Sequence, residues 1–149
     1  MYDMIIIGAG PAGLSAAIYG IRAGKSVLVL EGKTYGGQII NTPEVENYPG
    51  IKKMSGFEFA KGLYEQAKYL GAQIKMEKVI SVEKPEGGEQ ADMEAAQFDG
   101  NEENHKKEVS AFVVNTSKNS YEGATLILDM GPKNPLLGLP GEQELTGAG

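Results

Sequence analysis

The sequence predicts an α/β domain that starts with a parallel β-α-β unit. Three observations indicate it: a short apolar run at residues 4–8, a glycine-rich turn followed by a helical pattern, and a second apolar run at residues 26–31. Short, continuous apolar runs are typical of strands buried on both faces of a parallel sheet. The unit spans about thirty residues, which is the size that a parallel crossover needs.

The helix of this unit is expected at residues 14–23. Gly24 follows it, and glycine is favoured just past a helix C-terminus because it adopts the left-handed conformation without a steric penalty. Residues 32–53 should be irregular because turn-forming residues recur in them. These are Gly36, Gly37, Pro43, Pro49 and Gly50. An irregular segment of that length is uncommon in a compact domain and is often functional.

A second helix is predicted after Ser55, because Ser55 and Glu58 have the spacing of a capping box. It should run to Leu70 and end at Gly71. Its expected apolar face consists of Phe57, Ala60, Leu63, Tyr64, Ala67 and Leu70. Short strands are expected at residues 72–76, 79–82, 109–115 and 121–130.

Two later segments differ in composition from this pattern. Residues 84–108 are rich in Glu, Asp, Gly, Asn and Gln, which predicts an exposed excursion between strands. Residues 131–149 hold three Pro and five Gly, which is typical of a linker. We therefore expect one domain at residues 1–130, followed by a linker at residues 131–149.

Composition excludes several classes of function. The net charge of −6 argues against nucleic acid as the main partner, because phosphate contacts need a basic surface. No stretch approaches the ~18 apolar residues of a transmembrane helix, so no membrane partner is expected. The first residues enter an apolar run without a basic segment before it, so we expect no signal peptide and a cytoplasmic location.

Side chains for covalent or metal chemistry are scarce. The chain has no Cys, which excludes disulfides, thiolate metal sites and thiol chemistry within these 149 residues. Its single His, His105, lies in a polar stretch and is expected to be solvated. Because Asp and Glu show no paired arrangement, we assign no catalytic residue and no metal ligand.

The string Gly8, Ala9, Gly10, Pro11, Ala12 and Gly13 matches G-x-G-x-x-G. The pattern alone is weak in a glycine-rich chain, but here a strand precedes it, a helix follows it and an acid ends the next strand. Gly8 would allow the tight turn, Gly10 the approach of a pyrophosphate, and Gly13 close packing of the helix. Pro11 fits the first helical turn, where the free N–H groups and the helix dipole favour phosphate.

Glu31 is the acid that ends the second strand. Its carboxylate can accept hydrogen bonds from ribose hydroxyls, and it would repel the 2′-phosphate of NADP. The alternative is that the glycines only make turns and that Glu31 is a solvated charge. The β-α-β unit does not decide between FAD and NAD.

A longer and more specific string follows this unit. Residues 35–50, YGGQIINTPEVENYPG, closely resemble the GGQ…T.EVEN.PG segment of thioredoxin reductases, and residues 138–142, GLPGE, resemble the turn before that family's second domain. The resemblance covers the chain apart from the acidic excursion. It implies a Rossmann-like three-layer FAD/NAD(P)-binding domain with a parallel sheet and a small β-meander, incomplete at its C-terminus.

The resemblance also implies contacts with FAD. Gly36, Gly37 and Gln38 would meet its phosphate and ribityl region, with Gly32 beside Glu31. Thr42 and Asn47 would lie beside the isoalloxazine ring, to whose polar edge an amide offers both donor and acceptor. Local sequence alone favours a turn-stabilising role for Asn47. Two further expected contacts are Val79, at the adenine, and Gly131.

The chain departs from the family where that family has A-T-G-A, a backbone patch on FAD. Here the residues are Asp129, Met130, Gly131 and Pro132, so only the glycine is retained. Met130 is bulky where the family has a small hydroxyl, and Pro132 lacks an N–H donor. Weaker FAD binding is expected.

The family places an NADPH domain with a Cys-x-x-Cys pair after this region. Because the chain has no Cys and one G-x-G-x-x-G, we expect it not to complete a redox cycle alone. It would need the missing NADPH/disulfide domain, and it would form a homodimer as the family does. It could be a fragment, a truncated product or one component of a split enzyme.

Three functions remain open. The first is the FAD-binding part of a thioredoxin-reductase-like oxidoreductase, in which electrons pass from NADPH to FAD to a disulfide. The second is a non-catalytic FAD- or NAD-binding module that acts with a partner. The third is a plain NAD-binding domain, which Glu31 permits and the EVENYPG string disfavours.

Overall fold

The computed structural model describes residues 1–84, 111–129 and 131. Its elements in chain order are β1 (Tyr2–Ile7), α1 (Pro11–Arg22), β2 (Val27–Glu31), the 3-10 helix η1 (Gly37–Asn41), α2 (Gly56–Leu70), β3 (Gln73–Met76), β4 (Val79–Glu83), β5 (Phe112–Thr116) and β6 (Ser120–Leu128). The predicted β-α-β unit is present. Apart from residues 84 and 131, the predicted excursion and linker lie outside the described residues.

The described strands form one mixed sheet in the order β3-β2-β1-β6-β5-β4. β1 pairs in parallel with β2 and β6, and β2 pairs in parallel with β3. β4, β5 and β6 form an antiparallel meander. β6 therefore belongs to both parts, which confirms the expected α/β class with a parallel sheet and a small meander.

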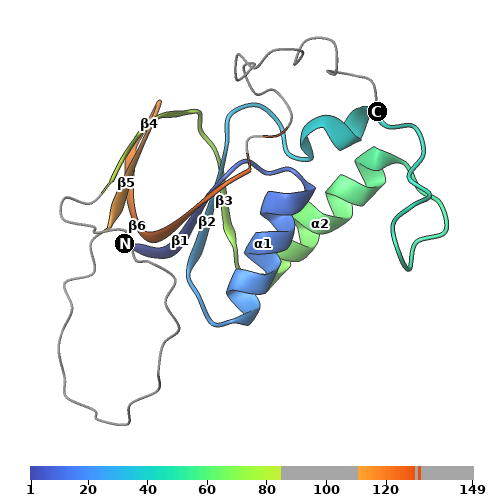
Figure 1. Cartoon of the computed structure of the whole chain (residues 1–149), viewed down its shortest axis with the longest axis horizontal. Helices are drawn as coiled ribbons and strands as arrows, with labels where there is room; N and C mark the ends of the chain where they lie inside the picture. The colour runs from blue at the N-terminus through green and yellow to red at the C-terminus, as the bar shows by residue number, and fades with distance from the viewer. Residues whose placement is uncertain (85–110, 130, 132–149) are drawn as a thin grey trace, which may run out of the picture.

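The two helices lie side by side and cover one face of β1, β2 and β3 (Figure 1). Their core contains Leu14 and Ala17 of α1, Ala67 of α2, and Ile6 and Val29 of the sheet. Small residues allow α1 to approach the sheet closely, since a Cβ on Gly20 of α1 would lie 2.9 Å from a methyl carbon of Val27 of β2. This core fixes the start of α1 against the end of β1.

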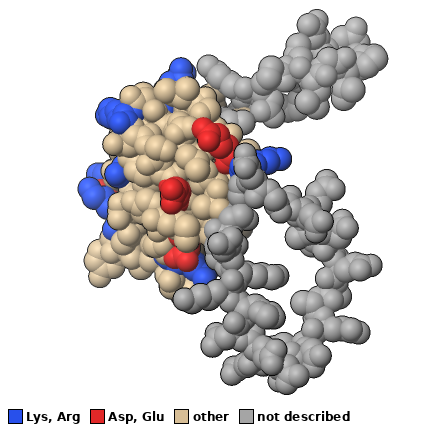
Figure 2. All heavy atoms as spheres, turned by 90° about the vertical axis from the view of Figure 1, so that its left-hand side faces the viewer, with Lys and Arg blue, Asp and Glu red and all other residues tan. Residues whose placement is uncertain are grey.

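The meander covers the opposite face of the sheet. Val114 of β5 is fully buried there against Ile5 of β1 and Leu28 and Leu30 of β2. β2 is thus covered on both sides, as its continuous apolar run predicted. Figure 2 shows the outer side of this layer, where the charged side chains of the described residues lie in separate spots on a largely uncharged face.

Helix α2 begins and ends as predicted, but its apolar face differs. Ser55 Oγ accepts a hydrogen bond from the Glu58 N–H at 3.2 Å, and Glu58 Oε2 accepts one from the Ser55 N–H at 3.1 Å. The expectation for Phe57 was wrong, since it is 51% exposed, whereas Phe59 is 8% exposed. Phe59 is covered by Tyr48 of the preceding loop, with ring centroids 4.7 Å apart, a contact that helical periodicity does not reveal.

Candidate functional site: the glycine-rich turn

The predicted glycine-rich turn connects β1 to α1, with Pro11 as the first helical residue. Gly8 has φ +110°, and a Cβ on it would fall on the main-chain carbonyl of Asp129. A Cβ on Gly13 would fall on the carbonyl oxygen of Gly8. Both glycines are therefore required by the close approach of turn, helix and β6, as their predicted roles imply.

Glu31 lies beside this turn. Its Oε2 accepts a hydrogen bond from the Ala9 N–H at 3.0 Å, and its Oε1 accepts one from the Lys33 N–H at 2.8 Å. The half-buried carboxylate is thus fixed by main-chain donors rather than left loose in solvent. Because each carboxylate oxygen has two acceptor sites, both oxygens can still accept a hydroxyl.

The Gly36-Gly37 pair packs against the same turn. The Gly36 N–H donates to the Ala9 carbonyl at 2.7 Å, and a Cβ on Gly37 would lie 3.7 Å from the Gly10 Cα. Both glycines have positive φ, +94° and +57°, which is the backbone region that glycine favours. Gln38 follows in η1 and is exposed.

The segment after η1 is fixed at both ends. The Thr42 carbonyl accepts a hydrogen bond from the Gly56 N–H at 3.0 Å, which joins it to the start of α2. Val45 and Met54 exchange main-chain hydrogen bonds of 2.7 and 3.2 Å, and Val45 is buried. Asn47 lies exposed between them, and within the described residues its side chain makes no hydrogen bond that would stabilise the turn.

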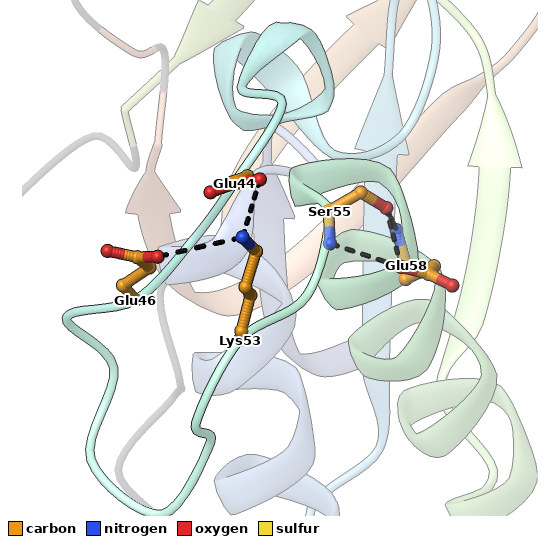
Figure 3. Close-up of polar contacts among 5 residues, drawn as sticks. All are labelled: Glu44, Glu46, Lys53, Ser55 and Glu58. Atoms are coloured by element: carbon orange, nitrogen blue, oxygen red, sulfur yellow. Dashed lines mark hydrogen bonds and ion pairs between the residues drawn. The ribbon is translucent and has the colours of Figure 1, made fainter.

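Charged side chains meet across this loop (Figure 3). Lys53 Nζ lies 2.7 Å from Glu44 Oε1 and 3.9 Å from Glu46 Oε1. All three side chains are more than half exposed, so the pairs contribute little stability. The main-chain bridge and the burial of Val45 hold the loop, and the adjacent Ser55–Glu58 capping box fixes the helix that follows.

The remaining predicted residues lie around this edge. A Cβ on Gly32 would approach the Lys78 Cα at 3.6 Å, so the end of β2 meets the link between β3 and β4, directly before Val79. Gly131 is exposed, with φ +67°. The glycine-rich turn, Glu31, Gly32 and the Gly36-Gly37 pair therefore meet at the carboxyl ends of parallel strands, where α/β folds bind nucleotides. Met130 and Pro132 lie outside the described residues.

Asp129 is a site residue that sequence reasoning missed. It directly follows β6, and its N–H donates to the Ile7 carbonyl at 2.7 Å. Its Oδ2 accepts a hydrogen bond from the Gly13 N–H at 2.7 Å. In the sequence, Asp129 stood out only as a departure from a family string. An acid that directly follows a strand beside β1 could nevertheless have been predicted to lie near the glycine-rich turn.

A second polar cluster lies at the link between β3 and β4. The buried Glu77 carboxylate accepts hydrogen bonds from Thr116 Oγ1 at 2.7 Å, Tyr121 OH at 3.0 Å and Asn119 Nδ2 at 3.1 Å. The hydrogen bond from Thr116 is the main cause that holds the pKa of Glu77 below its usual value. The Lys75 ammonium lies over the Tyr121 ring, 4.7 Å from its centroid.

Two kinds of feature are absent from the described residues. In the ranges given above, no three His, Asp or Glu residues are grouped closely enough to hold a metal ion. No helix in the described part of the chain has the length and apolar character needed to cross a membrane.

Comparison with known proteins agrees with the fold and the turn. The thioredoxin reductases of Peptoclostridium acidaminophilum and Bacillus subtilis are 38% and 37% identical over the whole chain, which covers 40% of each relative. The solved thioredoxin reductase of Streptococcus pyogenes is 34% identical with a TM-score of 0.70, and that of T. acidophilum is 32% identical with a TM-score of 0.69. Each structural alignment covers 97% of this chain and 40% of the solved one.

This chain thus spans about two fifths of the length of the curated relatives that it matches. The family model described as pyridine nucleotide-disulphide oxidoreductase matches residues 2–149. The sequence match, the Rossmann-like sheet and the glycine-rich turn agree, and the chain belongs to the pyridine nucleotide-disulphide oxidoreductase family.

Proposed function

We propose that this chain is the FAD-binding part of a thioredoxin-reductase-like flavoprotein oxidoreductase. The observation that carries the proposal is the meeting of Glu31 and the Gly36-Gly37 pair at the glycine-rich turn. A bound flavin would supply the electron-transfer chemistry, while the protein holds and orients it.

The residues present have the chemistry needed to bind most parts of FAD. Ala12 is an exposed residue at the start of α1, and its N–H makes no hydrogen bond among the described residues, so this donor would be available to a diphosphate. A main-chain hydrogen bond fixes the orientation of Glu31, which would bind the ribose. Gly36 and Gly37 pack against the turn, and together with Gln38 they would bind the ribityl region. Thr42 and Asn47 would face the isoalloxazine ring, Val79 the adenine and Gly131 the diphosphate side.

The electron path extends beyond these residues. In the complete enzyme, electrons would pass from NADPH through FAD to a disulfide. We assign the nicotinamide site and the dithiol to polypeptide outside these 149 residues, because the chain has one G-x-G-x-x-G and no Cys. Homodimer formation and a cytoplasmic location remain predictions, which sedimentation and cell fractionation would test.

Titration of the purified chain with FAD, followed by quenching of flavin fluorescence, tests the proposal. Glu31→Ala should weaken binding by about 1–3 kcal/mol, roughly 5- to 150-fold, the scale of lost hydrogen bonds to a charged group. Glu65→Ala removes the same charge from an exposed position on α2 and should leave binding unchanged. Equal affinities in the two variants would show that Glu31 does not contact the ribose.

A specific observation favours a second candidate, a non-catalytic module that holds a nucleotide for a partner. The Asp129 carboxylate lies at the diphosphate side of the turn, where it would lower affinity for FAD. Parallel titrations with FAD, NAD and ADP separate the candidates. Preference for FAD supports the oxidoreductase part, and equal weak binding of all three supports the module.

A further inference from the structure

We propose that Asp129 is an internal competitor of the cofactor's diphosphate: its carboxylate occupies the start of α1 and sets how tightly this chain holds a dinucleotide. The inference rests on the proposed function, because it concerns the same site. It assigns to one residue of this chain the control of affinity at that site.

The contacts place the carboxylate on the turn itself. Asp129 Oδ2 lies 2.7 Å from the Gly13 nitrogen and accepts its hydrogen bond. A Cβ on Gly10 or on Gly13 would lie 3.0 Å from that same oxygen. The oxygen therefore lies beside both glycines, and it uses the space at Gly10 that this fold class leaves open for a pyrophosphate.

Few main-chain donors of the turn remain for a ligand. The Ala9 N–H donates to Glu31, the Gly13 N–H donates to Asp129, and Pro11 has no N–H. The first turn of α1 contains no acidic residue of its own, so Asp129 is the anion that meets its positive end. A carboxylate bound to a helix N–H makes a charge-assisted hydrogen bond of the kind that a phosphate oxygen would make there.

The backbone of Asp129 is held at two points. Its N–H is bonded to Ile7, and its carbonyl lies directly against Gly8. A diphosphate could reach the Gly13 N–H only after the carboxylate rotates away about its side-chain bonds, and the two anions would still repel each other. Glu31 carries the same charge, but in the proposed function it would bind the uncharged hydroxyls of the ribose, so the two acids should change the affinity in opposite directions.

The experiment compares Asp129→Asn and Asp129→Ala with the unchanged chain. Affinities for FAD, ADP and adenosine are measured by titration calorimetry. Both variants should bind FAD and ADP roughly 10- to 100-fold more tightly, because a like charge near the diphosphate is removed. Binding of adenosine, which has no phosphate, should not change. Glu122→Gln, an exposed acid on β6, is the control for net charge.

Thermal unfolding gives a readout that needs no flavin. Asp129→Ala leaves the Gly13 N–H without its acceptor, so its Tm should fall, and millimolar inorganic pyrophosphate should raise that Tm more than it raises the Tm of the unchanged chain. Asp129→Asn keeps an acceptor oxygen, so the test remains available if the alanine variant does not fold.

The outcomes distinguish failure of the competitor role of Asp129 from failure of the proposed FAD-binding function. If the unchanged chain binds FAD and the Asp129 variants bind it equally or more weakly, the competitor role is overturned and the proposed function stands. If all three proteins are folded by circular dichroism and none binds FAD or ADP, the proposed function fails. If FAD binds only after Asp129 is replaced, both are supported.

Discussion

The glycine-rich turn and the Glu77 cluster are both polar sites at the ends of strands, but they are built from different parts of the chain. At the turn, carboxylates accept hydrogen bonds from main-chain N–H groups of residues that have almost no side chain. At the cluster, side chains separated by 39 to 44 residues bind one another. The turn therefore depends on residues with small side chains or none, whereas the cluster depends on the polar side chains of its residues.

Gly13→Ala should have the largest effect, because the new Cβ would collide with the Gly8 carbonyl and neither backbone can move freely. We expect a loss of about 3 kcal/mol or more in the free energy of unfolding, measured with urea. Gly62→Ala, on the exposed side of α2 with no atom near the new Cβ, is the matched control and should gain about 0.5–1 kcal/mol. Similar effects of both substitutions on the free energy of unfolding would contradict the claim that the turn has no space for a side chain at Gly13.

Glu77→Gln tests the cluster and should destabilise the protein less than Gly13→Ala. The hydrogen bond from Thr116 lowers the pKa of Glu77 in the folded state, so the ionised group stabilises the fold above the unfolded-state pKa. That contribution is lost as the pH falls through the lower folded-state pKa. The Tm of the variant should therefore lie below that of the unchanged chain at pH 7, and the gap should narrow in acid. A gap independent of pH would contradict this account.

Ser55→Ala should have the smallest effect, about 1 kcal/mol, because it removes one cap from α2. Ser55→Thr keeps a hydroxyl and should retain most of the stability. In the capping box the two side chains accept hydrogen bonds from main-chain N–H groups only three positions away in the chain, so it provides a local network to compare with the Glu77 cluster. If Ser55→Ala destabilised the protein as much as Glu77→Gln, local and distant networks would not differ in strength.

Sequence separation also explains which features could be predicted. The glycine-rich turn, the carboxylate of Glu31 and the capping box lie within one β-α-β unit or one helical turn, so motif spacing revealed them. Asp129 bonds to Gly13 across 116 residues, and no local pattern marks such a partner. Phe59 was missed for the same reason, since its cover comes from the loop around Tyr48 and not from its own helix.

The strand order has a consequence for the shape of the sheet. β3 and β4 stand at its two ends, yet two residues, Glu77 and Lys78, join them in the chain. The sheet must curl until its outermost strands nearly meet, and Val79 of β4 accordingly packs on the same cluster as Leu28 and Leu30 of β2. Among the described residues, this second core is enclosed by the curled sheet itself and not by a helix. Glu77 accepts hydrogen bonds from Thr116 of β5 and Tyr121 of β6, so it ties the link between the two outermost strands to the middle of the meander.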